Sequence, residues 1–113
     1  MIVLLAATIG CVLANAFEVV AKLARAQFML KNAAEVGVHE RWIPYLAVLE
    51  GAGVAGLVAG LLGLRGLGLA AAIGLVLFFV GAVGAHVRAR VFHNIAFPAA
   101  FLALAVAALG YFA

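Results

Sequence analysis

Long, continuous runs of apolar residues dominate this chain, and polar residues interrupt them at only a few points. The runs do not alternate between apolar and polar positions, which favours helices over membrane β-strands. A helix needs about 20 apolar residues to cross ~30 Å of hydrocarbon. The pattern therefore predicts a single membrane domain over residues 1–113, with spans at about 2–23, 42–64, 66–87 and 95–113.

The connections between these spans differ in length and character. A tight turn around Leu64, Arg65 and Gly66 joins the second span to the third, so we expect those two helices to be antiparallel neighbours. The first connection, 24–41, mixes charged and apolar residues and predicts an interfacial amphipathic segment that Gly37 breaks. The predicted fold is all-α: an up-down bundle of four transmembrane helices, with an interfacial segment between the first and second.

The polar residues of the first span share one face of its helix. They follow one another in steps of three and four residues, so that one stripe contains Thr8, Cys11, Asn15, Glu18, Lys22 and Arg25. Such a stripe cannot face lipid and must turn into the bundle or a wet cavity. Glu18 and Lys22 lie one turn apart with the acid first, which is the favourable order for an ion pair.

The remaining ionisable residues of the spans converge on the same end of an up-down bundle. Glu50 lies ~12 Å into the second span at 1.5 Å per residue, and His86 closes the third. A carboxylate at this depth must be paired with a cation such as Lys22 or His86, or be held protonated. The candidate ligand-binding or proton-handling residues are Glu50, His86, Lys22, Glu18 and Asn15; hydrogen bonding that only fixes helix packing is the alternative.

Glycines in the second and third spans predict close helix packing, because small residues let backbones approach one another. The expected packing residues are Gly53, Gly56, Gly60, Gly74 and Gly81. Several phenylalanines of the third and fourth spans either line a pocket or face lipid and core.

Composition agrees with a membrane protein and excludes several other classes. Hydrophobic residues make up 70% of the chain and charged residues 10%, against about 25% charged in soluble domains. No Lys or Arg precedes the first run, so we expect a retained span rather than a cleaved signal peptide. The single cysteine excludes dithiol chemistry within the chain, and the three histidines lack metal-ligand spacing, so no metal site is expected.

The distribution of cations predicts the orientation in the membrane. The first and third connections, with the end of the first span, hold Lys22, Arg25, Lys31, Arg41, Arg88 and Arg90, whereas the opposite side holds only Arg65. By the positive-inside rule the basic connections are expected in the cytoplasm and both termini outside, in a bacterial plasma membrane. These scattered cations form no basic patch with interleaved aromatics, so nucleic acid is not an expected partner.

The whole chain resembles the DoxX-like family of small four-helix membrane proteins. The matching elements are Asn15, Glu18 and Lys22 of the first span, then 49-LEGAG-53, 84-GAHVR-88 and 97-FPA-99. The resemblance implies a four-span fold and, loosely, a membrane subunit of a redox assembly, which makes a quinone the one cofactor to consider. Lys22, Glu50 and His86 are the positions that match the family pattern.

Three functions stay open at this stage. The first is a membrane subunit or accessory protein of a larger, redox- or quinone-linked complex, with other subunits or further copies as partners in the bilayer. The second is a binder of a quinone, sterol or lipid, and in a bolder version an acid–base enzyme. The third is a small dimeric exporter, which the second-span position of Glu50 disfavours. No autonomous catalytic motif is present, so enzymatic activity is the less favoured expectation.

Overall fold

The computed structural model describes residues 1–113 and consists of helices joined by short connections. The long helices are α1 (Ile2–Leu23), α3 (Ile43–Leu61), α4 (Arg65–Arg88) and α5 (Ala96–Phe112). A short helix, α2 (Gln27–Glu35), and a 3₁₀ turn, η1 (Glu40–Trp42), lie between α1 and α3. The predicted all-α class is confirmed, although α3 ends at Leu61 rather than near Leu64.

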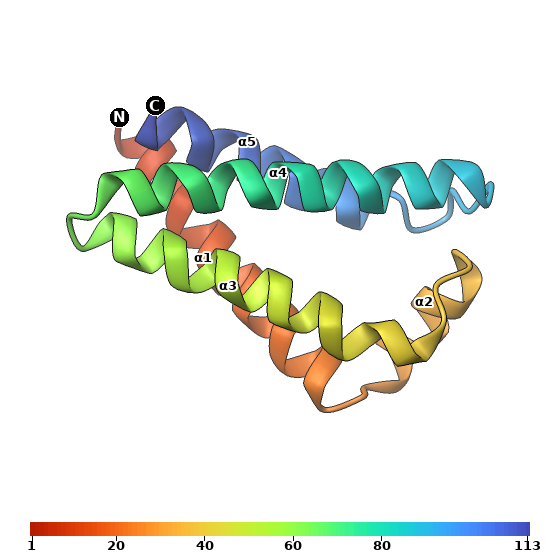
Figure 1. Cartoon of the computed structure of the whole chain (residues 1–113). Coiled ribbons are helices and arrows are strands. Elements are labelled where there is room, and N and C mark those ends of the chain that lie inside the picture. Colours follow the sequence, from red (N-terminus) through yellow and green to blue (C-terminus); the bar gives the residue numbers. More distant parts are fainter.

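The four long helices form a ring in which α1 and α4 each pack against both α3 and α5. The two chain termini and the α3–α4 turn lie at one end of the bundle, and α2 lies at the other (Figure 1). We call these the closed end and the open end, because α3 and α4 lie close together at the first and diverge toward the second (Figure 1).

Three helical segments are long and apolar enough to cross a membrane: Ile2–Leu23, Glu40–Leu61 and Arg65–Arg88. Helix α5 is also apolar but shorter, with 17 residues. The outward faces carry large apolar side chains, such as Phe17 and Leu77, which are more than 60% exposed. A surface of this kind suits lipid and would be a liability in water.

Glycines bring α3 and α4 together at the closed end. A Cβ atom at Gly60 would lie 2.5 Å from the Cα of Gly68, and one at Gly56 would lie 2.5 Å from the Cβ of Ala71. A Cβ at Gly53 would meet the side chain of Leu75 at 2.7 Å. Each of these three glycines therefore occupies a position that a larger residue could not fill without a shift of its neighbours.

Gly74 and Gly81 take no part in this contact, contrary to the expectation from the sequence. No atom lies within 4 Å of a Cβ built on either residue. The face of α4 that meets α3 runs through Gly68, Ala71 and Leu75, and both glycines are turned about a quarter of a circle from it at 100° per residue.

The α3–α4 turn comprises residues 62–64, slightly before the predicted position around Leu64, Arg65 and Gly66, and Gly63 shapes it. Gly63 has a φ of +120°, a conformation that side chains with a Cβ rarely adopt. Leu64 N–H donates to the carbonyl of Ala59 across this turn, which caps α3. Gly66 lies within the first turn of α4.

The connection between α1 and α3 contains the predicted amphipathic element. Helix α2 ends at Glu35, and Gly37 reverses the chain with a φ of +80°. Met29 and Val36 of this segment are buried, whereas Phe28 is half exposed. The segment thus folds back against the open end instead of extending away from it.

Candidate functional site

The open end of the bundle contains a cavity of about 310 Å³ that α2 covers on one side. Most of its wall is apolar, and the ionisable and polar residues on it are Glu18, Lys22, Asn32 and His86. All five α-helices, α1 to α5, contribute residues to the wall. The aromatic part of the wall comprises Phe78, Phe79, Phe97 and Phe101.

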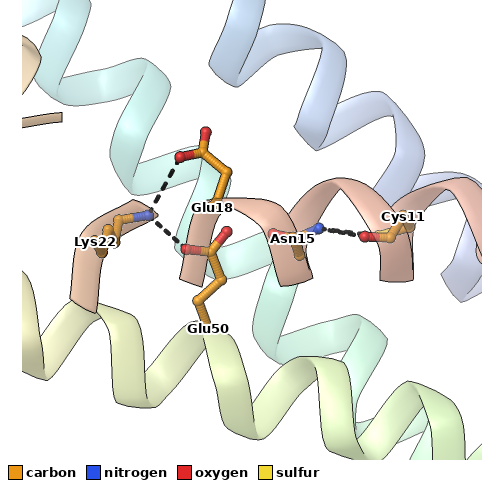
Figure 2. A network of polar contacts seen from close by, with 5 residues as sticks. All are labelled: Cys11, Asn15, Glu18, Lys22 and Glu50. Carbon is orange, nitrogen blue, oxygen red and sulfur yellow. Dashed lines mark hydrogen bonds and ion pairs between the residues drawn. The ribbon is translucent and has the colours of Figure 1, made fainter. Parts of the chain in front are cut away.

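Lys22 lies between two carboxylates beside this cavity. Its Nζ donates to Oε1 of Glu50 at 2.5 Å and lies 4.0 Å from Oε2 of Glu18. Figure 2 shows both carboxylates beside the Lys22 ammonium, with Glu18 and Lys22 on α1 and Glu50 on α3. The cluster therefore links α1 to α3 at the level where the bundle opens.

The three residues of this cluster differ in how they meet the cavity. Glu50 is fully buried and is absent from the cavity wall, whereas Glu18 and Lys22 both line it. The Glu50 carboxylate lies behind Lys22 and balances its charge. Glu18 is consequently the carboxylate that faces the cavity without a cation of its own.

His86 closes the opposite wall from the last turns of α4. Its side chain is 5% exposed, and its Nδ1 lies 2.9 Å from the carbonyl oxygen of Ala82. A carbonyl only accepts, so Nδ1 donates, and the neutral ring leaves a lone pair on Nε2. No partner occupies Nε2, although the atom is buried. Of the two partners expected for Glu50, the structure selects Lys22 and not His86.

Asn15 lies deeper in the bundle than the cavity. Its Nδ2 donates to the carbonyl of Cys11 at 2.8 Å, as Figure 2 shows, and its Oδ1 has no partner. Asn15, Cys11 and Thr8 are fully buried, so this part of the polar stripe turns into the bundle. Arg25 leaves the stripe, because it follows the end of α1 with a φ of +55° and pairs with the exposed Glu40.

Two polar contacts hold α2 over the cavity. His93 Nε2 lies 2.9 Å from Oε2 of Glu35, and Asn94 Nδ2 donates to Oδ1 of Asn32 at 2.5 Å. Both connect α2 to the segment between α4 and α5. We call this pair of contacts the α2 tether.

The sequence pattern does not indicate that His93 and Asn94 have partners on α2. Met29 and Asn32 are cavity residues that sequence reasoning missed. Their three-residue spacing on an amphipathic segment puts them on one face of a helix and was the available signal. Among the phenylalanines, Phe92 is exposed and lies outside the cavity wall.

The arrangement suits recognition of a small molecule more than it suits a metal. No group of three or more His, Cys, Asp or Glu side chains lies close enough to hold a metal ion. An apolar cavity with a few polar groups on one side is the usual form of a ligand pocket. The carboxylate of Glu18, the ammonium of Lys22 and the imidazole of His86 can contact the polar end of a molecule whose body fills the rest.

Comparison with known proteins places the chain in a family. The model of the DoxX-like family matches residues 6–108, which is most of the chain. Neither the curated proteins nor the solved structures contain a match. The chain belongs to the DoxX-like family, as its sequence resemblance indicated, and is a membrane protein.

Proposed function

We propose that this DoxX-like membrane protein binds a small, mainly apolar molecule in the cavity beneath α2, with the polar end of the molecule between Glu18 and His86. The observation that carries the proposal is an apolar cavity with ionisable groups on facing walls, at one end of the bundle. A quinone, a sterol or a lipid chain has the required mixture of an apolar body and a compact polar end.

Unsatisfied polar atoms favour a ligand over a purely structural cluster. Glu18 Oε2 and His86 Nε2 are buried, belong to residues of the cavity wall and have no hydrogen-bond partner. Buried polar groups in folded proteins are nearly always paired, and exceptions call for an explanation such as a bound molecule. A cluster that served helix packing alone would gain nothing from leaving these two atoms unpaired.

We further propose that all four long helices cross the membrane. Helix α5 is ~25 Å long at 1.5 Å per residue, which is at the short end of the spanning range. It packs against both α1 and α4, so it shares their depth in the bilayer. A modest mismatch of this kind is accommodated by local thinning of the bilayer.

The distribution of Lys and Arg supports an open end that faces the cytoplasm. The protein offers a clean way to test this orientation, because its single cysteine, Cys11, is fully buried. In a Cys11→Ala background, cysteine introduced at Arg41 should resist an impermeant maleimide added to intact cells, and cysteine at Leu64 should react. The reverse pattern would invert the proposed topology.

A cavity-filling variant tests the ligand-binding proposal. Ala85 on α4 lines the cavity and is half-buried, so Ala85→Phe should place a ring in it. With the protein in lipid nanodiscs, we expect the wild type to bind naphthylethanol above the level of empty discs. Ala85→Phe should reduce that binding about tenfold or more, since a filled pocket excludes the probe.

Ala103→Phe is the matched control, because Ala103 is exposed on α5 and lies outside the cavity. It should bind the probe as the wild type does, and helical content and melting should be similar for both variants. Equal probe binding by wild type and Ala85→Phe would refute binding in this cavity.

A second candidate, subunit of a larger membrane complex, is favoured by one separate observation. Gly74 and Gly84 of α4 are exposed, have open space beside them and lie outside the cavity wall, so the helix offers a glycine-bearing surface on which another helix could pack closely. Gly74→Leu should abolish association with a partner or a second copy while leaving probe binding intact. The two candidate functions are thus separable, since Ala85→Phe should do the opposite.

A further inference from the structure

We infer that the cavity selects a ligand whose polar end is a protonated amine, so that the natural ligand is a small lipophilic cation. The inference rests on the proposed function, since it assigns a chemical class to the ligand of the same cavity. It derives from the hydrogen-bonding inventory of the open end, from its charge and from the aromatic wall.

The hydrogen-bonding inventory shows a surplus of acceptors. The buried side-chain atoms that have no hydrogen-bond partner are Asn15 Oδ1, Glu18 Oε2, Glu50 Oε2, His86 Nε2 and Asn94 Oδ1. In the neutral form of His86, whose Nδ1 donates to Ala82, all five are acceptors, and two of them, Glu18 Oε2 and His86 Nε2, belong to residues of the cavity wall. None of them is a nitrogen or oxygen that can only donate. The chemical complement of such a site is a group that donates.

The charge of the cluster points the same way. Two carboxylates, Glu18 and Glu50, share the single ammonium of Lys22. Arg25, the next cation along the chain, is exposed and paired with Glu40. An uncompensated carboxylate beside apolar walls is costly, and a bound cation removes that cost. One proton shared by the carboxylates would cancel the charge but would add only one donor, whereas residues of the cavity wall carry two unpaired acceptors, Glu18 Oε2 and His86 Nε2.

Lys22 is poorly placed to donate hydrogen bonds to a ligand whose polar group can only accept them. Its ammonium lies against Glu50, 4.0 Å from Glu18 and 5.6 Å from the centroid of the Phe78 ring. A ketone or quinone oxygen would have to compete with two carboxylates for the same N–H groups. A ligand ammonium would not compete for these N–H groups, and Glu18 and His86, whose Oε2 and Nε2 atoms have no hydrogen-bond partner, both line the cavity.

The aromatic wall adds a favourable surface for a cation. Phe78, Phe79 and Phe101 line the cavity, and their rings follow one another with centroids 5.0 and 5.3 Å apart. Aromatic faces attract ammonium groups, and the attraction is strongest where water is excluded. The wall of the cavity thus combines the acceptors of Glu18 and His86 with aromatic rings.

Three probes that share one apolar body test the inference: naphthylethylamine, naphthylethanol and acetonaphthone. They present a cationic donor, a neutral hydroxyl and a pure acceptor, respectively. Binding to the protein in zwitterionic lipid nanodiscs is measured by equilibrium dialysis, with empty discs subtracted. We expect the amine to bind about tenfold tighter than the alcohol, and the ketone to bind most weakly, because hydrogen bonds to charged groups exceed neutral ones by this order.

Variants locate the preference in the cavity. Glu18→Gln removes the uncompensated charge and should bring the affinity for the amine down to that for the alcohol, while binding of the alcohol persists. Glu40→Gln is the matched control, because this exposed glutamate lies outside the cavity and should leave the preference unchanged.

The outcomes separate the two proposals. Equal or tighter binding of the ketone by the wild type, or a preference for the amine that survives Glu18→Gln, would overturn the inference and leave cavity binding standing. Binding of none of the three probes above empty discs would overturn both.

Discussion

The two ends of the bundle are held together by different chemistry. At the closed end, Gly56 and Gly60 bring α3 onto α4 so tightly that a single methyl group would collide with the neighbouring helix. At the open end, phenylalanines and charged side chains line a cavity between the helices, and Lys22 links α1 to α3 through Glu50. Figure 1 shows the consequence as the divergence of α3 from α4.

This difference shows how a small membrane protein can enclose a cavity without a large core. Inside a bilayer, apolar burial alone does little to hold helices together, so close packing and polar contacts carry that role. Here close packing joins one end and polar contacts join the other. The polar end is also the end at which Glu18 and His86 carry unpaired acceptor atoms and line the cavity.

The largest loss of stability should come from replacing Lys22, the cation that pairs with Glu50 at the open end. Lys22→Met leaves the fully buried Glu50 without a partner, a loss that costs roughly 3–5 kcal/mol when a buried charge pair is broken. We expect the free energy of unfolding to fall by this amount when unfolding in mixed micelles is followed by circular dichroism.

The double variant Lys22→Met with Glu50→Met is the control for charge, because replacing both partners of a buried pair is often nearly neutral. It should recover most of the lost stability. A single variant as stable as the wild type would show that the open end does not depend on this pair.

A smaller loss of stability should follow from adding a methyl group at the closed end. In Gly60→Ala the new Cβ would lie 2.5 Å from the Cα of Gly68 and 2.8 Å from the ring of Phe112. Backbone cannot yield as a flexible side chain does, so we expect a cost of ~1–3 kcal/mol from overpacking in the same unfolding assay.

Gly74→Ala provides the comparison for this change. Gly74 lies on α4, and no atom lies within 4 Å of a Cβ built at this position. It should leave the stability unchanged or raise it slightly, since alanine favours a helix over glycine. Equal effects of Gly60→Ala and Gly74→Ala would show that close packing at Gly60 does not hold the closed end together.

Much of the fold could be predicted because a membrane helix satisfies its own backbone hydrogen bonds, so continuous apolar runs define the helices directly. The turn between α3 and α4 was misplaced because glycines stand at both 63 and 66, and composition does not show which adopts a positive φ. Gly74 and Gly81 were assigned to the wrong contact for a related reason. The rotation of α4 about its axis depends on how all four helices pack.

The candidate site could be predicted in outline but not in detail. Glu18, Lys22, Glu50 and His86 lie near one end of the bundle because an up-down topology brings those chain positions together. The choice of Lys22 over His86 as the partner of Glu50 could not be foreseen, since it depends on helix rotation. The cover formed by α2 depends on a contact between residues far apart in the chain.

The smallest and most local effect is expected at α2, which covers the cavity at the open end. Asn94→Ala removes the hydrogen bond to Asn32, one of the two contacts of the α2 tether. A neutral hydrogen bond contributes about 0.5–1.5 kcal/mol, so amides of α2 should exchange with solvent roughly two- to tenfold faster. Amides of α3 and α4 at the closed end should keep their wild-type rates, because the tether does not reach them.

Phe92→Ala is the matched control for this experiment, because Phe92 precedes the tether in the same connection but is exposed and lies outside the cavity wall. If exchange in α2 accelerates in Asn94→Ala and not in Phe92→Ala, the tether governs access to the cavity from the open end. If α2 exchanges at the same rate in both variants and the wild type, α2 is held by the packing of Met29 and Val36, and access to the cavity must then depend on apolar contacts instead.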